Sequence, residues 1–267
     1  MTTIHLLGSS GFIGRAIQRA TGDLSVHCWS HKQSNRENYF DLFDPSSWES
    51  LLNKKPTTVI LLAWPGLPNY EDNIHVSQNL PACIELVDRL IDAGMQRLVV
   101  TGTCYEYGIQ NGLMMEDNLT DPLNCYAIAK DALRRTIANK CTSNGVDWCW
   151  TRIFYVYGEG QNPRSLLPSL YKAIDSGDEY FPMGSGEQIR DFVHVSEVAA
   201  QLLRLACSNN AKGVYNIGSG EPRSILQFVE EAISNYGGTI KLQRGALNNR
   251  ADEPLAFWAS IKKIKNV

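Results

Sequence analysis

Short apolar runs alternate with amphipathic stretches along most of the 267-residue chain. The apolar runs, which predict strands, lie at residues 3–7, 24–29, 57–64, 97–103 and 146–156. Stretches with helical spacing of apolar residues lie between them, at residues 15–20, from 45 onwards, at 79–93 and at 124–135. Runs such as residues 59–64 are apolar throughout, which fits strands of a parallel sheet buried on both faces. The alternation predicts an α/β fold with a doubly wound parallel sheet.

A glycine-rich turn joins the first predicted strand to the first predicted helix. It reads Gly8-Ser9-Ser10-Gly11-Phe12-Ile13-Gly14. Gly8 would allow a tight turn, Gly11 would let a pyrophosphate approach the backbone, and Gly14 would let the helix pack against the strand. The helix N-terminus would supply N–H groups and a favourable dipole to the phosphates. We therefore predict a Rossmann-type dinucleotide site here, with a glycine turn that binds nothing as the alternative.

The pattern changes after Gly158. Helical stretches follow at residues 165–176, 196–207 and 225–236, and strand-like runs follow at 190–195 and 213–218. We expect residues 1–157 plus 190–217 to form the dinucleotide-binding domain, and residues 158–189 plus 218–267 to form a small substrate-binding domain. This second domain would be a lid over the carboxyl ends of the strands, where ligands bind in such sheets.

Composition excludes several other classes of protein. A hydrophobic content of 43% and a charged content of 20% are ordinary for a globular protein, and a net charge of −3 gives no electrostatic reason to expect nucleic acid or an acidic membrane as a partner. The apolar runs are too short to span a bilayer, and the chain starts without a charged leader. Seven scattered cysteines and five histidines show no ligand spacing. We expect reduced thiols, a cytoplasmic location and no metal.

The end of the second predicted strand bears on the choice of cofactor. It reads Ser30-His31-Lys32, with Arg36 close behind and no acidic residue to hold a ribose 2′-hydroxyl. A hydroxyl and cations suit a 2′-phosphate, so the sequence favours NADP(H) and leaves NAD(H) open. A solvated polar loop is the alternative interpretation.

Tyr126 and Lys130 lie four residues apart in a stretch of helical composition. Residues at this spacing are neighbours on one helix face. An ammonium beside the phenol would lower its pKa from about 10 towards neutrality, where it can act as a general acid or base. The alternative is an ordinary surface pair.

In their order along the chain, these motifs resemble the extended short-chain dehydrogenase/reductase family, and more closely its NAD-dependent epimerase/dehydratase branch, which acts on nucleotide sugars. The resemblance covers essentially the whole length. It rests on Gly8-x-x-Gly11-x-x-Gly14, Asn79, Thr103, Tyr126-x-x-x-Lys130, residues 152–158, 186–195 and 216–218, and Arg250-x-x-Glu253-x-x-x-x-Trp258.

The resemblance implies a role for each matching residue. Thr103 would bond the substrate carbonyl, Tyr126 would protonate the developing alkoxide, and Lys130 would hold the nicotinamide ribose. The expected cofactor contacts are Gly8, Ser10, Gly11, Phe12, Ile13, Gly14, Ser30, His31, Lys32, Arg36, Asp41, Leu42, Leu62, Ala63, Trp64, Asn79, Thr101, Tyr126, Lys130, Phe154 and Val156. The expected substrate contacts are Thr103, Tyr105, Tyr155, Arg164, Leu166, Phe181, Arg190, Arg250 and Glu253.

The substrate implied is a nucleoside-diphosphate sugar. Arg190 and Arg250 match arginines that clamp the diphosphate, and Glu253 matches an acidic ribose contact; an ordinary salt bridge is the alternative for each arginine. Family members dimerise through the helix that carries the tyrosine, so we expect a homodimer.

Departures from the family pattern narrow the reaction. Cys104-Tyr105 stands where the 4,6-dehydratases have Asp-Glu, and Tyr105 stands where carbon-inverting enzymes have a cysteine. We interpret Cys104 as a packing cysteine. Tyr155 replaces the usual asparagine before Val-Tyr-Gly, so the sugar pocket differs from that of common epimerases.

Because the residues for elimination of water and for carbon inversion are missing, simple hydride transfer is the reaction that remains. We expect an NADPH-dependent reductase for the C4 ketone of a nucleoside-diphosphate 4-keto-6-deoxy sugar, in the biosynthesis of activated deoxysugars. An NAD-dependent nucleotide-sugar 4-epimerase that retains its cofactor is one alternative, and a non-catalytic dinucleotide-binding subunit is another. The sequence does not identify the base, the sugar or the product stereochemistry.

Overall fold

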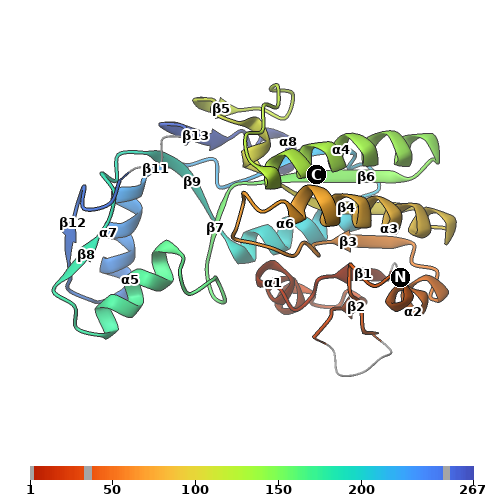
Figure 1. The fold of residues 1–267 in the computed structure, drawn as a ribbon, viewed down its shortest axis with the longest axis horizontal. Helices are drawn as coiled ribbons and strands as arrows, with labels where there is room; N and C mark the ends of the chain where they lie inside the picture. Colours follow the sequence, from red (N-terminus) through yellow and green to blue (C-terminus); the bar gives the residue numbers. More distant parts are fainter. Residues whose placement is uncertain (1–2, 33–37, 249–252) are drawn as a thin grey trace.

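A six-stranded, entirely parallel sheet forms the larger part of the computed structural model, which describes residues 3–32, 38–248 and 253–267 (Figure 1). Its strand order is β2–β1–β3–β4–β6–β10, and this confirms the predicted doubly wound fold. The strands are β1 (Ile4–Leu7), β2 (Val26–Trp29), β3 (Thr58–Leu61), β4 (Arg97–Thr103), β6 (Asp147–Ile153) and β10 (Gly213–Ile217). The strand order reverses between β1 and β3, so a ligand crevice is expected beyond their carboxyl ends.

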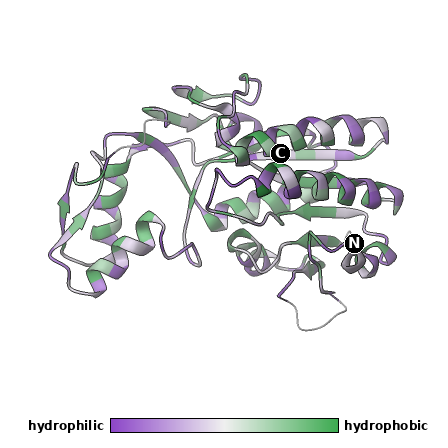
Figure 2. Ribbon diagram, viewed as in Figure 1, coloured by the Kyte–Doolittle hydropathy of each residue, from purple (hydrophilic) through white to green (hydrophobic). Residues whose placement is uncertain are grey.

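Helices cover both faces of this sheet. On one face α1 (Phe12–Ala20) packs against α6 (Val195–Cys207), and on the other α3 (Leu80–Asp92) packs against α4 (Cys125–Ser143), with the short α2 (Glu49–Asn53) near the edge. Each face has its own cluster of buried apolar side chains. Figure 2 shows green and purple alternating along α3, as expected for an amphipathic helix that covers a sheet.

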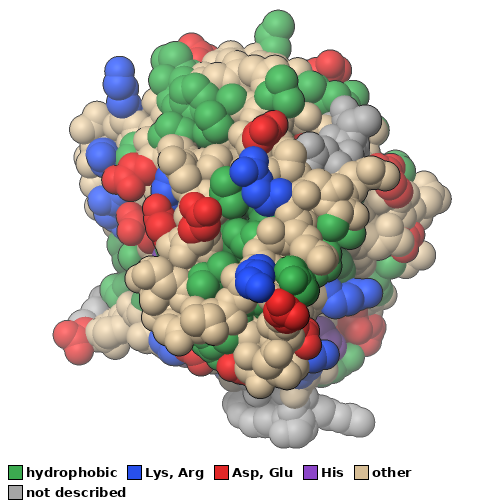
Figure 3. Space-filling view, turned by 90° about the vertical axis from the view of Figure 1, so that its left-hand side faces the viewer, with side chains coloured by type: hydrophobic (Ala, Val, Ile, Leu, Met, Phe, Trp, Pro, Cys, Tyr) green, Lys and Arg blue, Asp and Glu red, His purple; other side chains and the backbone are tan. Residues whose placement is uncertain are grey.

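A second, smaller body projects from the main sheet at the left of Figure 1. There α5 (Leu166–Asp175) and α7 (Ile225–Tyr236) pack beside a two-stranded sheet of β8 (Tyr180–Pro182) and β12 (Lys241–Gln243) around a third apolar cluster. Figure 3, which faces this end, shows acidic and basic side chains lying beside one another.

A mixed sheet connects the two bodies. It has the order β11–β9–β13–β5, with β7 also paired to β9. The strands are β5 (Gly112–Met114), β7 (Tyr155–Tyr157), β9 (Ile189–His194), β11 (Pro222–Ser224) and β13 (Ala256–Ala259).

The chain's last helix returns to the larger body. α8 (Lys262–Lys265) contacts β10, and its Ile264 is buried among side chains of α6. This packing involves residues that we expected in the small domain, and the exact domain boundaries stay a prediction.

Candidate active site

The glycine turn after β1 packs as its sequence suggests. Gly8 has φ +93°, and a Cβ on it would lie 2.7 Å from the backbone nitrogen of Ala63, which follows β3. A Cβ on Gly14 would lie 2.5 Å from the carbonyl oxygens of both Gly8 and Ser9. Any larger residue at either position would force the turn away from β3 or the helix away from the turn. The turn is therefore held directly at the point where the strand order reverses.

The N-terminus of α1 has room for a phosphate group. Gly11 is its N-cap residue, is exposed, and makes no side-chain cap. A Cβ on Gly11 would meet one atom within 4 Å, the carbonyl oxygen of Gly8 at 3.3 Å. Open space in front of uncapped N–H groups is what a pyrophosphate requires, so these residues fit a dinucleotide.

Arg15 supports the same turn, and sequence reasoning missed it. Its guanidinium donates to the carbonyl oxygens of Ser10 at 2.6 Å and Gly160 at 3.0 Å. It therefore connects the glycine turn to the loop after β7. Arg15 directly follows the third glycine of the turn, and this position could have indicated that its side chain supports the turn.

The residues expected near the adenosine end lie around the carboxyl end of β2. Ser30 is buried, its hydroxyl accepts from the Lys32 backbone at 3.2 Å, and the side chains of His31 and Lys32 are exposed. Asp41 accepts from the Phe43 backbone at 2.9 Å. Leu42 is buried, and Arg36 lies outside the described residues. The Lys32 ammonium and the His31 ring thus remain accessible where a 2′-phosphate would bind.

Thr103, Tyr126 and Lys130 meet at the carboxyl end of β4. Thr103 is the last residue of that strand, its hydroxyl accepts from the Tyr105 backbone at 3.3 Å, and its side chain lies near enough to the Tyr126 phenol to lower the pKa of that phenol. Asn124 precedes α4, and its side chain caps the helix by accepting from the Ala127 backbone at 2.8 Å. Tyr126 is 8% exposed and Lys130 is 3% exposed, so the surface-pair interpretation is wrong.

The predicted lowering of the Tyr126 pKa is also wrong. Burial raises this pKa, the nearby Tyr70, Glu106 and Cys104 raise it further, and the Thr103 side chain, which lowers it, only partly offsets them. The Lys130 ammonium does not reverse the balance, because it donates to the Thr101 carbonyl oxygen at 2.9 Å and lies 3.8 Å from the centre of the Trp64 ring. Its distance to the Tyr126 ring centre is 6.0 Å. Tyr126 is therefore held in its protonated form.

Burial also affects Lys130 itself. It lowers the Lys130 pKa to about 8, while Cys83 and Glu106 act in the opposite direction. The lysine can therefore change its charge within an accessible pH range.

Aromatic side chains from the segment after β3 surround Tyr126. The rings of Tyr70, His75 and Trp64 lie 5.6, 5.4 and 6.1 Å from its ring, centre to centre. The indole of Trp64 donates to His75 Nδ1 at 3.1 Å, so the neutral imidazole carries its proton on Nε2 and donates to the Asn69 carbonyl oxygen at 2.7 Å. Trp64 was an expected cofactor contact, whereas Tyr70 and His75 were missed because no motif marks them.

Asn79 and Thr101 lie close to the same crevice. Asn79 is fully buried and donates to the Pro65 carbonyl oxygen at 2.8 Å, and its own oxygen has no partner among the described residues. Thr101 donates to the Leu61 carbonyl oxygen at 3.4 Å. The Asn79 oxygen is thus an unsatisfied acceptor beside the expected cofactor site.

The remaining expected cofactor contacts serve as packing around the crevice. Phe154 stacks on Phe257 with ring centres 5.1 Å apart. The apolar clusters on the two faces of the main sheet include Phe12, Ile13, Leu62, Ala63 and Val156 as partly buried members.

The expected substrate contacts form two groups. Tyr105 and Tyr155 have ring centres 6.2 Å apart, and the Arg190 guanidinium lies 5.3 Å from the Tyr155 ring. Arg190 is 1% exposed and donates to Glu253 at 2.9 Å, which brings two predicted residues together as the salt bridge considered above. Arg190 Nε and the Tyr155 hydroxyl have no hydrogen-bond partner within the described ranges. Polar capacity therefore remains for a ligand at this position.

The second group belongs to the small body. Arg164 is exposed in the loop before α5, while Leu166 and Phe181 pack in its apolar cluster. Their contact with a substrate stays a prediction, and Arg250 lies outside the residues that the structure describes.

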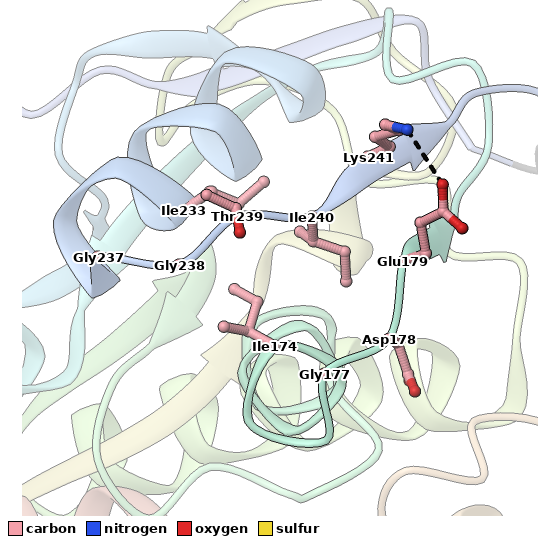
Figure 4. A pocket seen from close by; sticks show the side chains of 10 residues that line it. All are labelled: Ile174, Gly177, Asp178, Glu179, Ile233, Gly237, Gly238, Thr239, Ile240 and Lys241. Atoms are coloured by element: carbon pink, nitrogen blue, oxygen red, sulfur yellow. Dashed lines mark hydrogen bonds and ion pairs between the residues drawn. The ribbon is translucent and has the colours of Figure 1, made fainter.

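An open cavity of about 770 Å³ lies elsewhere on the small body, between α5, α7 and the start of β12 (Figure 4). Isoleucines 174, 233 and 240 point into it, and Lys241 pairs with Glu179 at its rim. None of its lining residues belongs to the candidate active site.

Other reactive groups near Thr103 are occupied or buried. Cys104 lies in an apolar cluster, and burial raises the pKa of its thiol, which agrees with a packing role. Glu106 is fully buried and accepts from Trp150 and Arg152. Among the described residues, no three His, Cys, Asp or Glu side chains lie where they could hold a metal ion, and no helix is long and apolar enough to cross a bilayer.

Known proteins of similar sequence belong to a family that binds a dinucleotide. The model of the NAD dependent epimerase/dehydratase family matches residues 4–218. The dTDP-6-deoxy-L-talose 4-dehydrogenase (NAD(+)) of Aggregatibacter actinomycetemcomitans is 28% identical over 224 residues, covering 83% of this chain and 82% of that protein. The dTDP-6-deoxy-L-talose 4-dehydrogenase (NAD(P)(+)) of Kitasatospora kifunensis is 26% identical over 260 residues, covering 88% of this chain and 79% of that protein.

A solved structure of a related protein has the same fold. MoeE5 in complex with UDP-glucose and NAD matches with a TM-score of 0.82 at 26% identity, covering 100% of this chain and 92% of that one. The resemblance drawn from the sequence is confirmed. The protein belongs to the NAD dependent epimerase/dehydratase family.

Proposed function

We propose that this protein transfers hydride at C4 of a nucleoside-diphosphate sugar, and that it reduces a 4-keto-6-deoxy sugar with NADPH. One observation carries the proposal. Thr103, Tyr126 and Lys130 meet at the end of β4, whereas Cys104 beside them is buried and the buried Glu106 is engaged by Trp150 and Arg152. Among the residues that the structure describes, this arrangement supplies Tyr126 as the proton donor and no unengaged carboxylate or exposed thiol beside it for elimination or carbon inversion.

The side chains support a simple mechanism. NADP(H), when bound in the crevice, would supply the hydride. The Thr103 and Tyr126 hydroxyls would hold the C4 carbonyl oxygen, and Tyr126 would donate its proton to that oxygen as negative charge develops on it. One hydride and one proton convert the ketone to a secondary alcohol. The raised Tyr126 pKa keeps the proton in place until then, and the Lys130 ammonium would stabilise the phenolate left behind.

The relatives support the substrate class. Two of them are 4-dehydrogenases of a dTDP-6-deoxy sugar, which interconvert an alcohol and a ketone at C4. Exposed His31 and Lys32 support NADP(H), although one of these relatives is described with NAD(+) and the other with NAD(P)(+). Arg190, Arg250 and Glu253 remain proposed contacts to the diphosphate and ribose. A homodimer and a cytoplasmic location also stay predictions.

A panel of CDP-, dTDP-, GDP- and UDP-linked 4-keto-6-deoxy sugars tests the proposal, with NADPH and NADH oxidation followed by absorbance. We expect oxidation with at least one of these sugars and faster oxidation of NADPH. No oxidation with any of them would rule out the reductase.

The cofactor content of the purified protein separates the alternatives. A 4-epimerase would retain tightly bound NAD and would interconvert 4-epimers without added cofactor, since the same three residues serve both reactions. A non-catalytic subunit would bind NADPH and show no turnover. The reductase is expected to exchange its cofactor freely.

A further inference from the structure

A buried carboxylate lies directly behind the proposed reacting groups, and the mechanism above does not use it. Glu106 belongs to a single 3₁₀ turn, Cys104–Tyr107, that begins immediately after Thr103, and its side chain is fully buried. One of its oxygens accepts from the Thr103 backbone N–H at 3.0 Å. The carboxylate therefore holds the backbone of the residue that would bind the substrate oxygen.

The same carboxylate connects β4 to two further elements. Trp150 Nε1 of β6 donates to both of its oxygens, at 2.9 and 3.1 Å, and Arg152 Nε of the same strand donates at 2.9 Å. Arg134, on the helix that carries Tyr126 and Lys130, lies 3.8 Å away. Burial raises the pKa of Glu106, and the Arg152 guanidinium with the Thr103 and Trp150 N–H donors opposes this rise. Each hydrogen-bonding partner is an N–H donor, and this suits an ionised carboxylate that accepts on both oxygens.

The neighbouring backbone is shaped for this contact. Gly102 is the residue before Thr103, and a Cβ on it would collide with both Trp150 Nε1 and the Glu106 carboxylate. The hydrogen bond between Trp150 and Glu106 thus passes across an α-carbon that has room for it only because that residue is glycine. A glycine, an indole and an arginine together hold one charged group in place.

We propose that Glu106 is a positioning residue for hydride transfer: it holds Thr103 in register with α4 and places a fixed negative charge behind Tyr126 and Lys130. The inference rests on the proposed function only in taking Thr103, Tyr126 and Lys130 as the reacting set. Glu106 itself touches no substrate.

One carboxylate faces both members of the pair. Glu106 lies near Tyr126 and Lys130, whereas burial raises the pKa of the Cys83 and Cys104 thiols and keeps them uncharged. Because a negative charge raises the pKa of both groups, it favours a protonated phenol and a charged ammonium. That is the protonation state in which Tyr126 can donate a proton and Lys130 can stabilise the resulting phenolate.

The test compares the wild-type protein with Glu106→Gln, which keeps the shape of the side chain and removes its charge. The ¹³Cε signal of Lys130, assigned by its absence in Lys130→Met, reports the charge of this lysine during a pH titration. NADPH fluorescence reports cofactor binding, and initial rates report turnover. We expect the Lys130 midpoint to fall by at least about half a pH unit, turnover to fall about 10- to 100-fold, and the affinity for NADPH to stay unchanged.

Two further variants show whether an effect is due to the Glu106 charge itself. Asp147→Asn removes a carboxylate on β6 that pairs with Arg97 at 2.9 Å, far along the strand from Arg152, and we expect it to leave the Lys130 titration and turnover as in the wild type. The double variant Glu106→Gln/Arg152→Met removes the buried pair together and leaves no unpaired buried charge, so it is used if the single variant does not fold.

The outcomes are distinct. An unchanged Lys130 midpoint in a folded Glu106 variant, or the same shift in Asp147→Asn, overturns the inference. A wild-type protein that turns over no 4-keto sugar defeats the proposed function instead, while the Lys130 titration still decides the role of the Glu106 charge.

Discussion

At the scale of single residues, helix spacing alone gave the wrong chemistry for the tyrosine–lysine pair. Four-residue spacing correctly places Tyr126 and Lys130 on the same side of α4, but it does not determine where a long, flexible side chain ends. The Lys130 ammonium reaches the Thr101 carbonyl oxygen and the Trp64 ring, and both lie on other segments. Glu106 was missed for another reason. Comparison with the family pattern concerned Cys104 and Tyr105, the positions where related enzymes have additional catalytic residues and this chain does not.

Tyr126 is the residue on which the proposed reaction depends most. Tyr126→Phe removes the proton donor while keeping the buried ring, so we expect turnover to fall about 10²- to 10⁴-fold with unchanged affinity for NADPH. Initial rates and fluorescence titration measure the two quantities. Tyr236→Phe is the matched control, because that hydroxyl pairs with Asp175 on the small body. Turnover within tenfold of the wild type in Tyr126→Phe would contradict the proposed role.

The charge of Lys130 should be visible in the pH dependence of stability. Its pKa of about 8 lies below the unfolded value of 10.5, so between these values the unfolded chain binds more protons than the folded chain. The free energy of unfolding therefore rises with pH in this window, by about 2 kcal/mol from pH 7 to 9.5. Denaturant titrations of the cofactor-free protein measure this rise, and Lys130→Met should lack it. An identical slope in both proteins would contradict a pKa near 8.

At the scale of elements, the strands and helices of the main sheet were predictable, and the short strands of the two smaller sheets mostly were not. The boundaries of β4 and α7 match the predicted ranges, because each is a continuous run with clear turn or cap signals. β5, β8, β11 and β12 have three residues each, and β13 has four. A strand of three residues carries no periodicity, and its existence depends on partners distant in the chain, such as β13 beside β5.

The glycine turn offers a sharp test of what each glycine contributes. Gly11→Ala adds a methyl group in front of α1 whose one close contact is the Gly8 carbonyl oxygen at 3.3 Å, so we expect a folded protein with at least about tenfold weaker NADPH binding. Gly14→Ala would place a methyl group against two carbonyl oxygens, so we expect a loss of about 1–3 kcal/mol in the free energy of unfolding. Thermal unfolding and fluorescence titration separate the two effects. Equal NADPH affinity in Gly11→Ala and the wild type would argue against a phosphate at this helix end.

At the scale of the whole molecule, the mixed sheet explains how one chain forms both halves of the candidate site. β9 pairs with β13 through its first residues and with β7 through its last ones, and Arg190 on β9 lies beside the Tyr155 ring of β7 and pairs with Glu253 shortly before β13. Sequence comparison anticipated Arg190 and Glu253 as site residues. It did not show that they bind each other, because that contact depends on pairing between segments more than 60 residues apart.

The stability of the main sheet should be sensitive to acid because of a histidine in its first strand. His5 is buried on β1, where its Nδ1 accepts from Trp29 Nε1 at 3.2 Å. Burial, with His27 and Lys54 nearby, lowers its pKa to about 4. The unfolded chain, with a value of 6.5, takes up a proton first as the pH falls, so stability is full above pH 6.5 and is lost towards pH 4.

We expect this histidine alone to remove about 2–3 kcal/mol from the free energy of unfolding between pH 7 and 4.5. Denaturant titrations of the wild type and His5→Gln at the two pH values measure the effect as a difference. The glutamine oxygen can still accept from Trp29, so the variant tests the charge and keeps the hydrogen bond. His31→Gln, at an exposed position, should retain the full acid sensitivity of the wild type. If His5→Gln loses as much stability on acidification as the wild type, the proton responsible binds elsewhere in the fold.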